Sequence, residues 1–414
     1  MSRLWRAPGP LFGLHQLHAM RVGEVRVMSA GQRGGGAAGR QIELGDLIPQ
    51  SPLLPSSPTA QGAPAPLPIL DQRTRGTKFI QLPVRSVLNN PASTGMGFWS
   101  INPYVGCEFG CTYCYARDTH RWTVERAVRR NEGTREGNEE RTESSIVPSF
   151  PRSLLPPEEA FEKEILVKTD VAEVLSRTLN PAKLAGHSLV IGTATDPYQP
   201  AERQFQLTRR ILEVLRSYHG LSIGIITKSA LITRDLDVLQ ALSERNEVTV
   251  NISLATADAR LARRLELRSP VPSARLRALR RLTEGGIHAG LLVAPIIPGV
   301  TDDWAGLARL IEAAKEAGAR YVVGSALRLG PAARHRFLPF LTKEFPALAE
   351  RYRRHYAGKD HVSQSYQDAL TRRLRLLQQA YGFPVDEGMR RRRQLEGRSP
   401  RKSAATSDEQ ATLL

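Results

Sequence analysis

Short apolar segments alternate with longer amphipathic segments along the central part of the chain. The apolar segments are rich in β-branched residues, and the segments between them repeat apolar residues with the period of an α-helix. The predicted strands lie at 100–106, 162–168, 187–195, 221–228, 247–255, 288–296 and 319–327. The predicted helices include Pro200–Tyr218, Arg234–Glu244, Pro272–Glu284 and Asp302–Ala317. This alternation predicts repeated βα units, and therefore an α/β fold built around a parallel sheet.

The number of βα units narrows the choice among parallel folds. About six units in about 230 residues are too few to close an eight-stranded barrel, so we expect a partial (βα)6 barrel of the TIM type. A doubly wound open sheet is the alternative.

The two ends of the chain differ in composition from this core, which we place at residues 76–338. Residues 1–75 are rich in Gly, Pro, Ser and Ala, which predicts a disordered leader or linker. Residues 129–149 are polar and aperiodic and predict an exposed insertion in the core. A helical period continues through 339–388, and 389–414 read as a basic disordered tail.

Hydropathy and charge limit the partners of the chain. No apolar run approaches the roughly 18 residues that span a bilayer, so we expect no membrane partner and a cytoplasmic location. The formal net charge is +17, which permits binding to nucleic acid. Eight arginines lie in a segment with Glu266 as its one acid: Arg260, Arg263, Arg264, Arg268, Arg275, Arg277, Arg280 and Arg281. They form either a phosphate-binding patch or a solvated helix face.

The chain has three cysteines, Cys107, Cys111 and Cys114, in the spacing C-x3-C-x2-C. An odd, tightly clustered set does not suit a disulfide framework, whereas three nearby thiolates suit an iron–sulfur or zinc centre. Structural zinc takes four ligands, and the nearest fourth candidate, His120, falls in a predicted helix. Three ligands on a four-iron cluster leave one iron open to a substrate or cofactor. The sequence therefore favours a catalytic iron–sulfur enzyme, with a non-catalytic iron–sulfur or zinc binding module as the alternative.

The carboxyl ends of parallel strands are where functional groups gather in such folds. This rule selects the cysteine loop and the segments 193–196, 227–229, 253–256 and 295–298, which include Lys228 and Ser253.

The cysteine spacing, with Tyr113 before the last cysteine, resembles the cluster motif of the radical S-adenosylmethionine (radical SAM) superfamily. The segments TATDPYQPAE from Thr193, ITKS around Lys228 and SLAT from Ser253 are similar to its spore photoproduct lyase branch. The resemblance implies a [4Fe-4S] cluster on the three cysteines that reductively cleaves S-adenosylmethionine to a 5′-deoxyadenosyl radical. It also implies a reductant such as flavodoxin or ferredoxin, and a partial barrel fold.

The resemblance further implies roles for single residues. Thr195, Lys228 and Ser253 match positions that contact S-adenosylmethionine, and Tyr113 would pack against it. Asp196 would also face the cofactor, although before a proline it is equally suited to a turn.

The position of a hydrogen-donating cysteine in the spore lyase corresponds here to Thr193. A threonine hydroxyl is a far poorer hydrogen-atom donor than a thiol, so we do not expect repair of spore photoproduct by that route. Thr193 and Tyr115 are the candidate catalytic residues, and either Tyr115 or Tyr113 could relay a hydrogen atom.

Overall fold

The computed structural model describes residues 68–73, 76–94, 97–120, 155 and 157–385. All of these lie in one compact unit, 64–414. The predicted insertion at 129–149 and the predicted tail at 389–414 fall outside the described residues, as does most of the predicted leader. The last residues of that leader include a strand, β1 (Ile69–Gln72), so regular structure begins before the expected boundary at residue 75.

The main sheet follows the order of the sequence. Its seven strands are arranged β11-β10-β9-β8-β7-β4-β3, and all neighbours from β4 to β11 run parallel, whereas β3 is antiparallel to β4. The strands are β3 (Leu88–Asn89), β4 (Trp99–Ile101), β7 (Ser188–Ile191), β8 (Ser222–Thr227), β9 (Glu247–Ser253), β10 (His288–Ile296) and β11 (Val322–Ala326).

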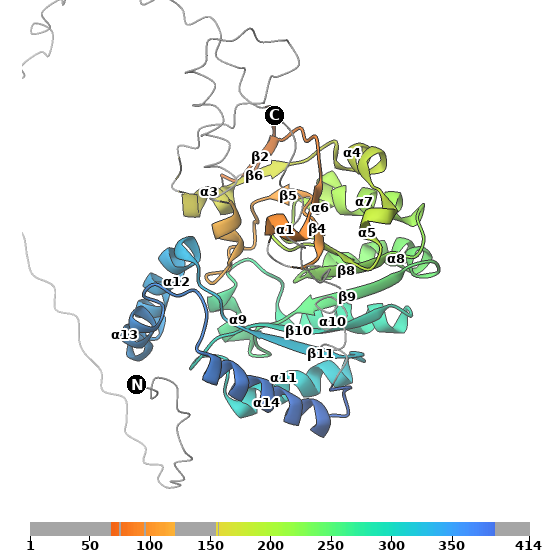
Figure 1. The fold of residues 1–414 in the computed structure, drawn as a ribbon. Coiled ribbons are helices and arrows are strands. Elements are labelled where there is room, and N and C mark those ends of the chain that lie inside the picture. The colour runs from red at the N-terminus through yellow and green to blue at the C-terminus, as the bar shows by residue number, and fades with distance from the viewer. Residues whose placement is uncertain (1–67, 74–75, 95–96, 121–154, 156, 386–414) are drawn as a thin grey trace, which may run out of the picture. The chain divides into compact units, whose positions relative to one another are not determined.

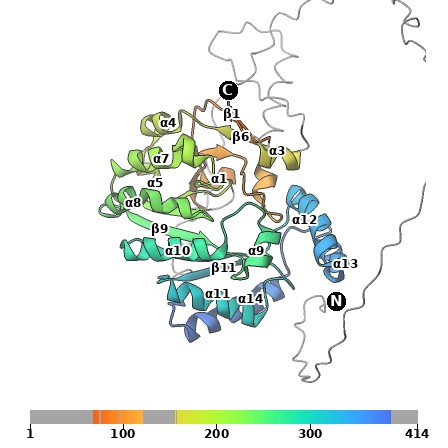
Figure 2. The ribbon, with the colours of Figure 1, turned by 180° about the vertical axis from the view of Figure 1, so that it is seen from behind.

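Helices cover the outer face of this curved sheet (Figures 1 and 2). They are α4 (Val171–Thr178), α7 (Leu207–Arg216), α8 (Leu236–Ser243), α10 (Pro272–Glu284) and α11 (Trp304–Glu316). The short helices α1 (Pro91–Thr94), α5 (Pro181–Leu184), α6 (Glu202–Phe205) and α9 (Ala259–Leu265) lie in the connections between strands. The inner face bounds a cavity of about 1200 Å³. Six parallel strands in sequential order around a cavity confirm the predicted partial barrel.

A second, smaller sheet carries the start of the cysteine loop. Its order is β1-β2-β6-β5, with β2 (Lys78–Gln81), β5 (Tyr104–Val105) and β6 (Glu164–Val167). The segment 162–168, predicted as one of the barrel strands, therefore belongs to this sheet. The predicted strand 100–106 divides between the two sheets, because β4 ends at Ile101 and β5 pairs antiparallel with β6 after Asn102-Pro103.

Two helices also differ from the bounds predicted for them. The predicted helix 200–218 divides into α6 and α7 at Gln206, whose φ of 50° lies in the left-handed region. The predicted helix 234–244 begins as a 3-10 helix at Ala230–Asp235 and becomes α8.

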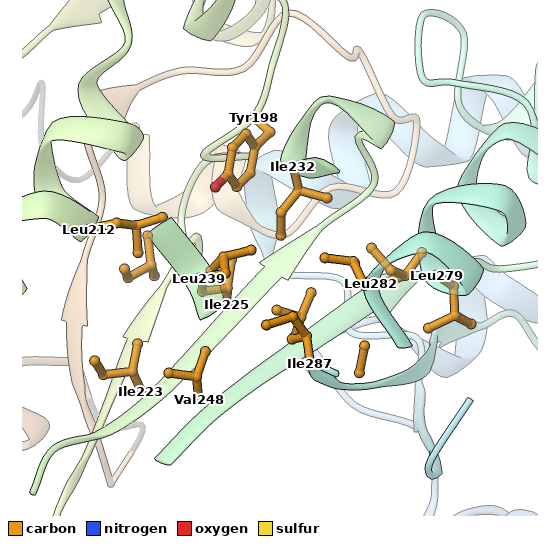
Figure 3. Close-up of a cluster of buried hydrophobic side chains, with 14 of the residues drawn as sticks. Tyr198, Leu212, Ile223, Ile225, Ile232, Leu239, Val248, Leu279, Leu282 and Ile287 are labelled. Carbon is orange, nitrogen blue, oxygen red and sulfur yellow. The ribbon is translucent and has the colours of Figure 1, made fainter. Parts of the chain in front are cut away.

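The strands of the barrel alternate between a packed outer face and an open inner face. In β8, Ile223 and Ile225 are buried against the helices, where they lie near Leu212 and Leu239 (Figure 3). The alternate residues Ser222, Gly224 and Ile226 are less buried and line the cavity. The hydrophobic core therefore lies between the sheet and the helices, and the interior of the barrel stays open.

Helix α3 (Pro157–Lys163) precedes β6. Three helices follow β11, namely α12 (Pro331–Glu344), α13 (Pro346–His355) and α14 (Gln364–Ala380). The Tyr352 hydroxyl donates to the Pro298 carbonyl at 2.6 Å and so ties α13 to the loop after β10. In the described residues no helix has the length and hydropathy needed to cross a membrane.

We expect Ile225→Ala to lower the free energy of unfolding by about 2–5 kcal/mol, because it leaves a cavity in a packed core. Ile226→Ala is the matched control: its side chain faces the cavity, where truncation leaves no new void, and we expect a clearly smaller loss. Urea unfolding of the two variants measures both effects. Equal losses would contradict the division between packed and open faces.

Candidate active site

All ten residues proposed from the sequence line one cavity on the inner face of the barrel. They are Cys107, Cys111, Tyr113, Cys114, Tyr115, Thr193, Thr195, Asp196, Lys228 and Ser253. They come from the loops that follow β5, β7 and β8 and, for Ser253, from the last position of β9, so the rule of converging carboxyl ends holds for this site.

The cysteine loop between β5 and the helix that starts at residue 116 depends on two glycines. Gly106 and Gly110 have φ values of 91° and 63°, in the left-handed region that favours glycine. A Cβ on Gly106 would lie 2.8 Å from the Phe161 carbonyl oxygen. The glycines thus let the loop turn sharply while it packs against neighbouring chain, with Cys107 and Cys111 buried and Cys114 partly exposed.

The segment that starts at Thr193 holds the first half of the cysteine loop. The Thr195 hydroxyl donates to the Gly106 carbonyl at 2.6 Å, and the Glu108 amide donates to the side-chain oxygen of Gln199 at 2.9 Å. Gln199 also donates from Nε2 to the Thr195 hydroxyl at 3.0 Å. This segment therefore supports the backbone of the cysteine loop as well as lining the cavity.

Asp196 joins the carboxyl ends of β7 and β8. Its carboxylate accepts hydrogen bonds from the Thr227 hydroxyl at 2.6 Å, the Lys228 amide at 2.8 Å and the Tyr198 amide at 2.9 Å. Burial raises the pKa of this carboxyl, and the hydrogen bonds oppose that rise. Asp196 thus has the role in a turn that the sequence allowed. Its bond to the Lys228 amide also fixes the backbone from which the lysine side chain projects.

The second half of the cysteine loop is held by the segment after α9. Cys111 and Glu266 form an antiparallel bridge, and the Thr112 amide donates to the Leu265 carbonyl at 2.9 Å. The Cys111 Sγ lies 3.7 Å from the Ser269 hydroxyl oxygen.

A buried ion pair between Glu266 and Arg275 contacts the hydroxyl of Tyr113. Both side chains are no more than 2% exposed. Glu266 accepts the Tyr113 hydroxyl, and Arg275 also donates to the Ser253 carbonyl at 2.9 Å. Burial alone would raise the pKa of Glu266, but the charges of Arg275 and Lys228 outweigh it and lower that pKa.

Sequence reasoning placed Arg275 in a surface patch and left Glu266 unassigned. A single acid among eight arginines indicated that Glu266 would form an ion pair, but it did not show that the pair would be buried.

Lys228 presents its ammonium group to the cavity. Its Nζ lies 5.8 Å from the centroid of the Tyr113 ring and, in the described part of the chain, makes no hydrogen bond to a protein atom. Burial lowers the pKa of this lysine, but the nearby Cys111 and Glu266 outweigh burial and raise it. The group is therefore a fixed positive charge beside the thiols.

Thr193 and Tyr115, the two proposed catalytic residues, are in contact. The Tyr115 hydroxyl donates to the Thr193 carbonyl at 2.5 Å, and the Thr193 hydroxyl accepts from Asn102 Nδ2 at 3.1 Å. Asn102 also accepts from the Ala194 amide at 2.8 Å. Asn102 was missed because the predicted strand 100–106 contained it, whereas β4 ends at Ile101 and leaves Asn102 directly after the strand.

A second missed residue, Glu162, joins three arginines outside the cysteine loop. It forms ion pairs with Arg117, Arg268 and Arg336. Arg117 also donates to the Cys111 carbonyl at 3.2 Å. Burial would raise the pKa of Glu162, but Arg117 and Arg268 outweigh burial and lower it.

The eight arginines of the segment 260–281 do not form one surface. Arg275 is buried, and Arg268 reaches Glu162 and the Glu108 carbonyl. The others are exposed on α9 or on α10. The interpretation of all eight arginines as one phosphate-binding patch is therefore wrong for the whole set, because Arg275 is buried in the core.

The donor set suits a metal centre ligated by sulfur. Burial raises the pKa of Cys111 to about 12, although the charge of Lys228 opposes the rise, so metal binding there would release a proton. Within the described ranges, no three His, Cys, Asp or Glu side chains converge on a position for a single metal ion. The three thiols border the cavity together, with backbone contacts that leave every sulfur available as a ligand.

Comparisons with known proteins agree with this geometry. Residues 101–311 match the profile of the Radical SAM superfamily. An uncharacterized protein of Mycobacterium bovis is 30% identical over 341 residues, which cover 82% of this chain and 89% of that one. An uncharacterized protein of Methanocaldococcus jannaschii is 27% identical over 51% of this chain and 66% of its own.

Two solved structures of spore photoproduct lyase variants resemble the chain in fold. Both bind dinucleoside spore photoproduct, one with S-adenosylmethionine as well. Each has a TM-score of 0.51 and 14% sequence identity, over 74% of this chain and 80% of the other.

We expect Arg275→Ala to lower the free energy of unfolding by about 3–5 kcal/mol, because it leaves the Glu266 charge buried without its partner. Arg277→Ala, two residues along the same helix and exposed, should change stability by no more than about 0.5 kcal/mol. Urea unfolding at neutral pH measures both. A loss at Arg275 no larger than that at Arg277 would exclude a structural role for the pair.

Proposed function

The chain belongs to the radical SAM superfamily, and from this premise we propose that Cys107, Cys111 and Cys114 hold a [4Fe-4S] cluster at which S-adenosylmethionine is reductively cleaved. Members of the superfamily use both groups. The observation that carries the proposal is that the three thiols and the Lys228 ammonium line one cavity at the carboxyl ends of the parallel strands.

When bound, the reduced cluster supplies the electron that breaks a carbon–sulfur bond of S-adenosylmethionine and gives methionine and a 5′-deoxyadenosyl radical. The protein has to bind the cofactor, orient it and keep other groups away from the radical.

Lys228 is the candidate partner for the cofactor carboxylate. Its charge is fixed, its Nζ has no hydrogen bond to a described protein atom, and Asp196 holds its backbone. A lysine so placed can form a charge-assisted hydrogen bond to an incoming carboxylate.

Thr195 and Ser253 would act as acceptors. The Thr195 hydroxyl proton is directed to the Gly106 carbonyl and that of Ser253 to the Ala294 carbonyl at 3.1 Å. Each oxygen keeps acceptor capacity, which suits the amino or ribose hydroxyl groups of S-adenosylmethionine. Tyr113 would contact the cofactor with its ring, because its hydroxyl is directed to Glu266.

Tyr115 is the better hydrogen relay of the two tyrosines in the loop. Its side chain is 41% exposed and reaches the cavity wall at Thr193, whereas Tyr113 is 4% exposed. Thr193 would then position Tyr115 through its carbonyl and need not donate a hydrogen atom itself.

The reacting part of the substrate should be uncharged. The middle of the cavity wall is formed by Gly224, Ile226, Thr249, Asn251 and Leu292, none of which carries charge. A nucleobase could enter such a space while its phosphates stay outside. Structurally similar lyase variants bind a dinucleoside, which makes nucleic acid the first substrate class to test.

The proposed function predicts that anaerobically reconstituted protein releases 5′-deoxyadenosine from S-adenosylmethionine when dithionite is added. Cys111→Ala should lose the cluster, because two protein ligands hold it too weakly and expose it to oxygen. Ser269→Ala is the control, since Ser269 contacts Cys111 without being a proposed ligand. Iron and sulfide content and product release are measured together. A Cys111→Ala protein with full iron content, or wild type with a cluster but no product, would contradict the proposal.

We further predict that Lys228→Ala weakens binding of S-adenosylmethionine and leaves the iron content unchanged. Loss of one charged hydrogen bond costs about 1.5–3 kcal/mol, which corresponds to roughly 10- to 150-fold in affinity. Lys183→Ala, an exposed lysine on α5, is the control. Titration calorimetry on the reconstituted proteins gives both affinities, and an unchanged affinity for the Lys228 variant would remove this residue from the cofactor site.

A further inference from the structure

The outer side of the cysteine loop is covered by α9 and the segment 266–271, and this cover carries exposed apolar side chains. Leu267 and Val271 are 40% and 37% exposed. They are two of the seven exposed large hydrophobic side chains among the described residues, and only four positions separate them. Large apolar groups left exposed close together are typical of a surface that binds a partner.

This cover is in direct contact with the proposed ligands. The segment pairs with Cys111 through Glu266, and its Ser269 hydroxyl lies 3.7 Å from the Cys111 Sγ. The Arg268 amide donates to the Phe109 carbonyl at 3.0 Å. A protein bound to this surface would thus be separated from Cys111 by a single layer of chain.

The same surface is positively charged. Arg260, Arg263 and Arg264 on α9 and Arg268 beyond it are exposed. Two of these arginines are paired with acids, Arg264 with Glu344 of α12 at 2.7 Å and Arg268 with Glu162, whereas Arg260 and Arg263 form no ion pair with a described residue. The acids of the segment itself are engaged elsewhere, because Glu266 is buried with Arg275 and Asp258 caps α9. Both ribbon views place α9 beside α12 (Figures 1 and 2). We call the exposed set Arg260, Arg263, Arg264, Leu267, Arg268 and Val271 the α9 face.

The two sides of the cysteine loop differ in what can reach them. The inner side borders the cavity, which the cofactor and substrate fill during reaction under the proposed function. An electron donor must therefore approach from an outer side while the substrate is bound.

We propose that the α9 face is the docking surface for an acidic one-electron donor protein, which delivers one electron at a time through the Cys111 side of the loop. The proposal rests on the proposed function. Apolar groups among the arginines favour a protein over nucleic acid, because protein interfaces combine an apolar centre with a charged rim. Opposite charge on the two partners raises the rate of encounter, and salt screens this effect.

The test compares two reductants on the full-length reconstituted protein. Release of 5′-deoxyadenosine is measured with dithionite, which needs no docking surface, and with an acidic flavodoxin reduced by NADPH and its reductase. In the double variant Arg260→Glu with Arg263→Glu, we expect the flavodoxin-driven rate to fall on the order of tenfold or more at low salt. The dithionite-driven rate should stay within about twofold of wild type. Leu267→Ser should also lower only the flavodoxin-driven rate.

The matched control is Arg277→Glu with Arg281→Glu, the same change in charge on exposed residues of α10. This variant should retain both rates. Equal flavodoxin-driven rates in the two double variants would overturn the proposal, as would loss of both rates in the α9 variant. If the α9 variant instead loses binding to DNA or RNA while its flavodoxin-driven rate is unchanged, the surface binds nucleic acid. Absence of product from wild type with dithionite would refute the proposed function instead of the docking surface.

Discussion

The loop of residues 106–114 is fixed through its backbone, which leaves its three thiols available as the proposed cluster ligands. Its carbonyl and amide groups bond to Thr195, Gln199, Phe161 and Leu265, which come from three different parts of the chain. Each contact leaves the sulfur atoms available. The need to hold the loop by its backbone explains why three segments lie against it: the segment after β7, α3 and the segment after α9.

The same requirement explains why a buried ion pair is kept near the site. Glu266 and Arg275 together hold Tyr113, the Ser253 carbonyl and the bridge to Cys111. A pair of this kind adds little stability over an apolar core, yet breaking it is costly, so it favours one arrangement over others. Near Lys228, the charges of Glu266 and Arg275 thus balance each other.

Much of the fold could be predicted because apolar period and strand spacing report on local structure. The six parallel strands and the grouping of all ten proposed residues followed from βα alternation and the carboxyl-end rule. The sheet that 164–167 would join could not be predicted, because an apolar run does not encode its partner. Arg275 was placed on a surface for a related reason: sequence shows its charge, whereas burial depends on Glu266, which lies nine residues away in sequence.

The central claim is that the three thiols hold a cluster with one iron open to S-adenosylmethionine, next to Lys228. The most direct measurement is the electron paramagnetic resonance spectrum of the dithionite-reduced protein before and after S-adenosylmethionine is added. The account predicts the signal of a reduced [4Fe-4S] cluster whose g values shift when the cofactor binds, with a weaker response in Lys228→Ala at the same cofactor concentration. A cluster signal that S-adenosylmethionine leaves unchanged in wild type would contradict the account.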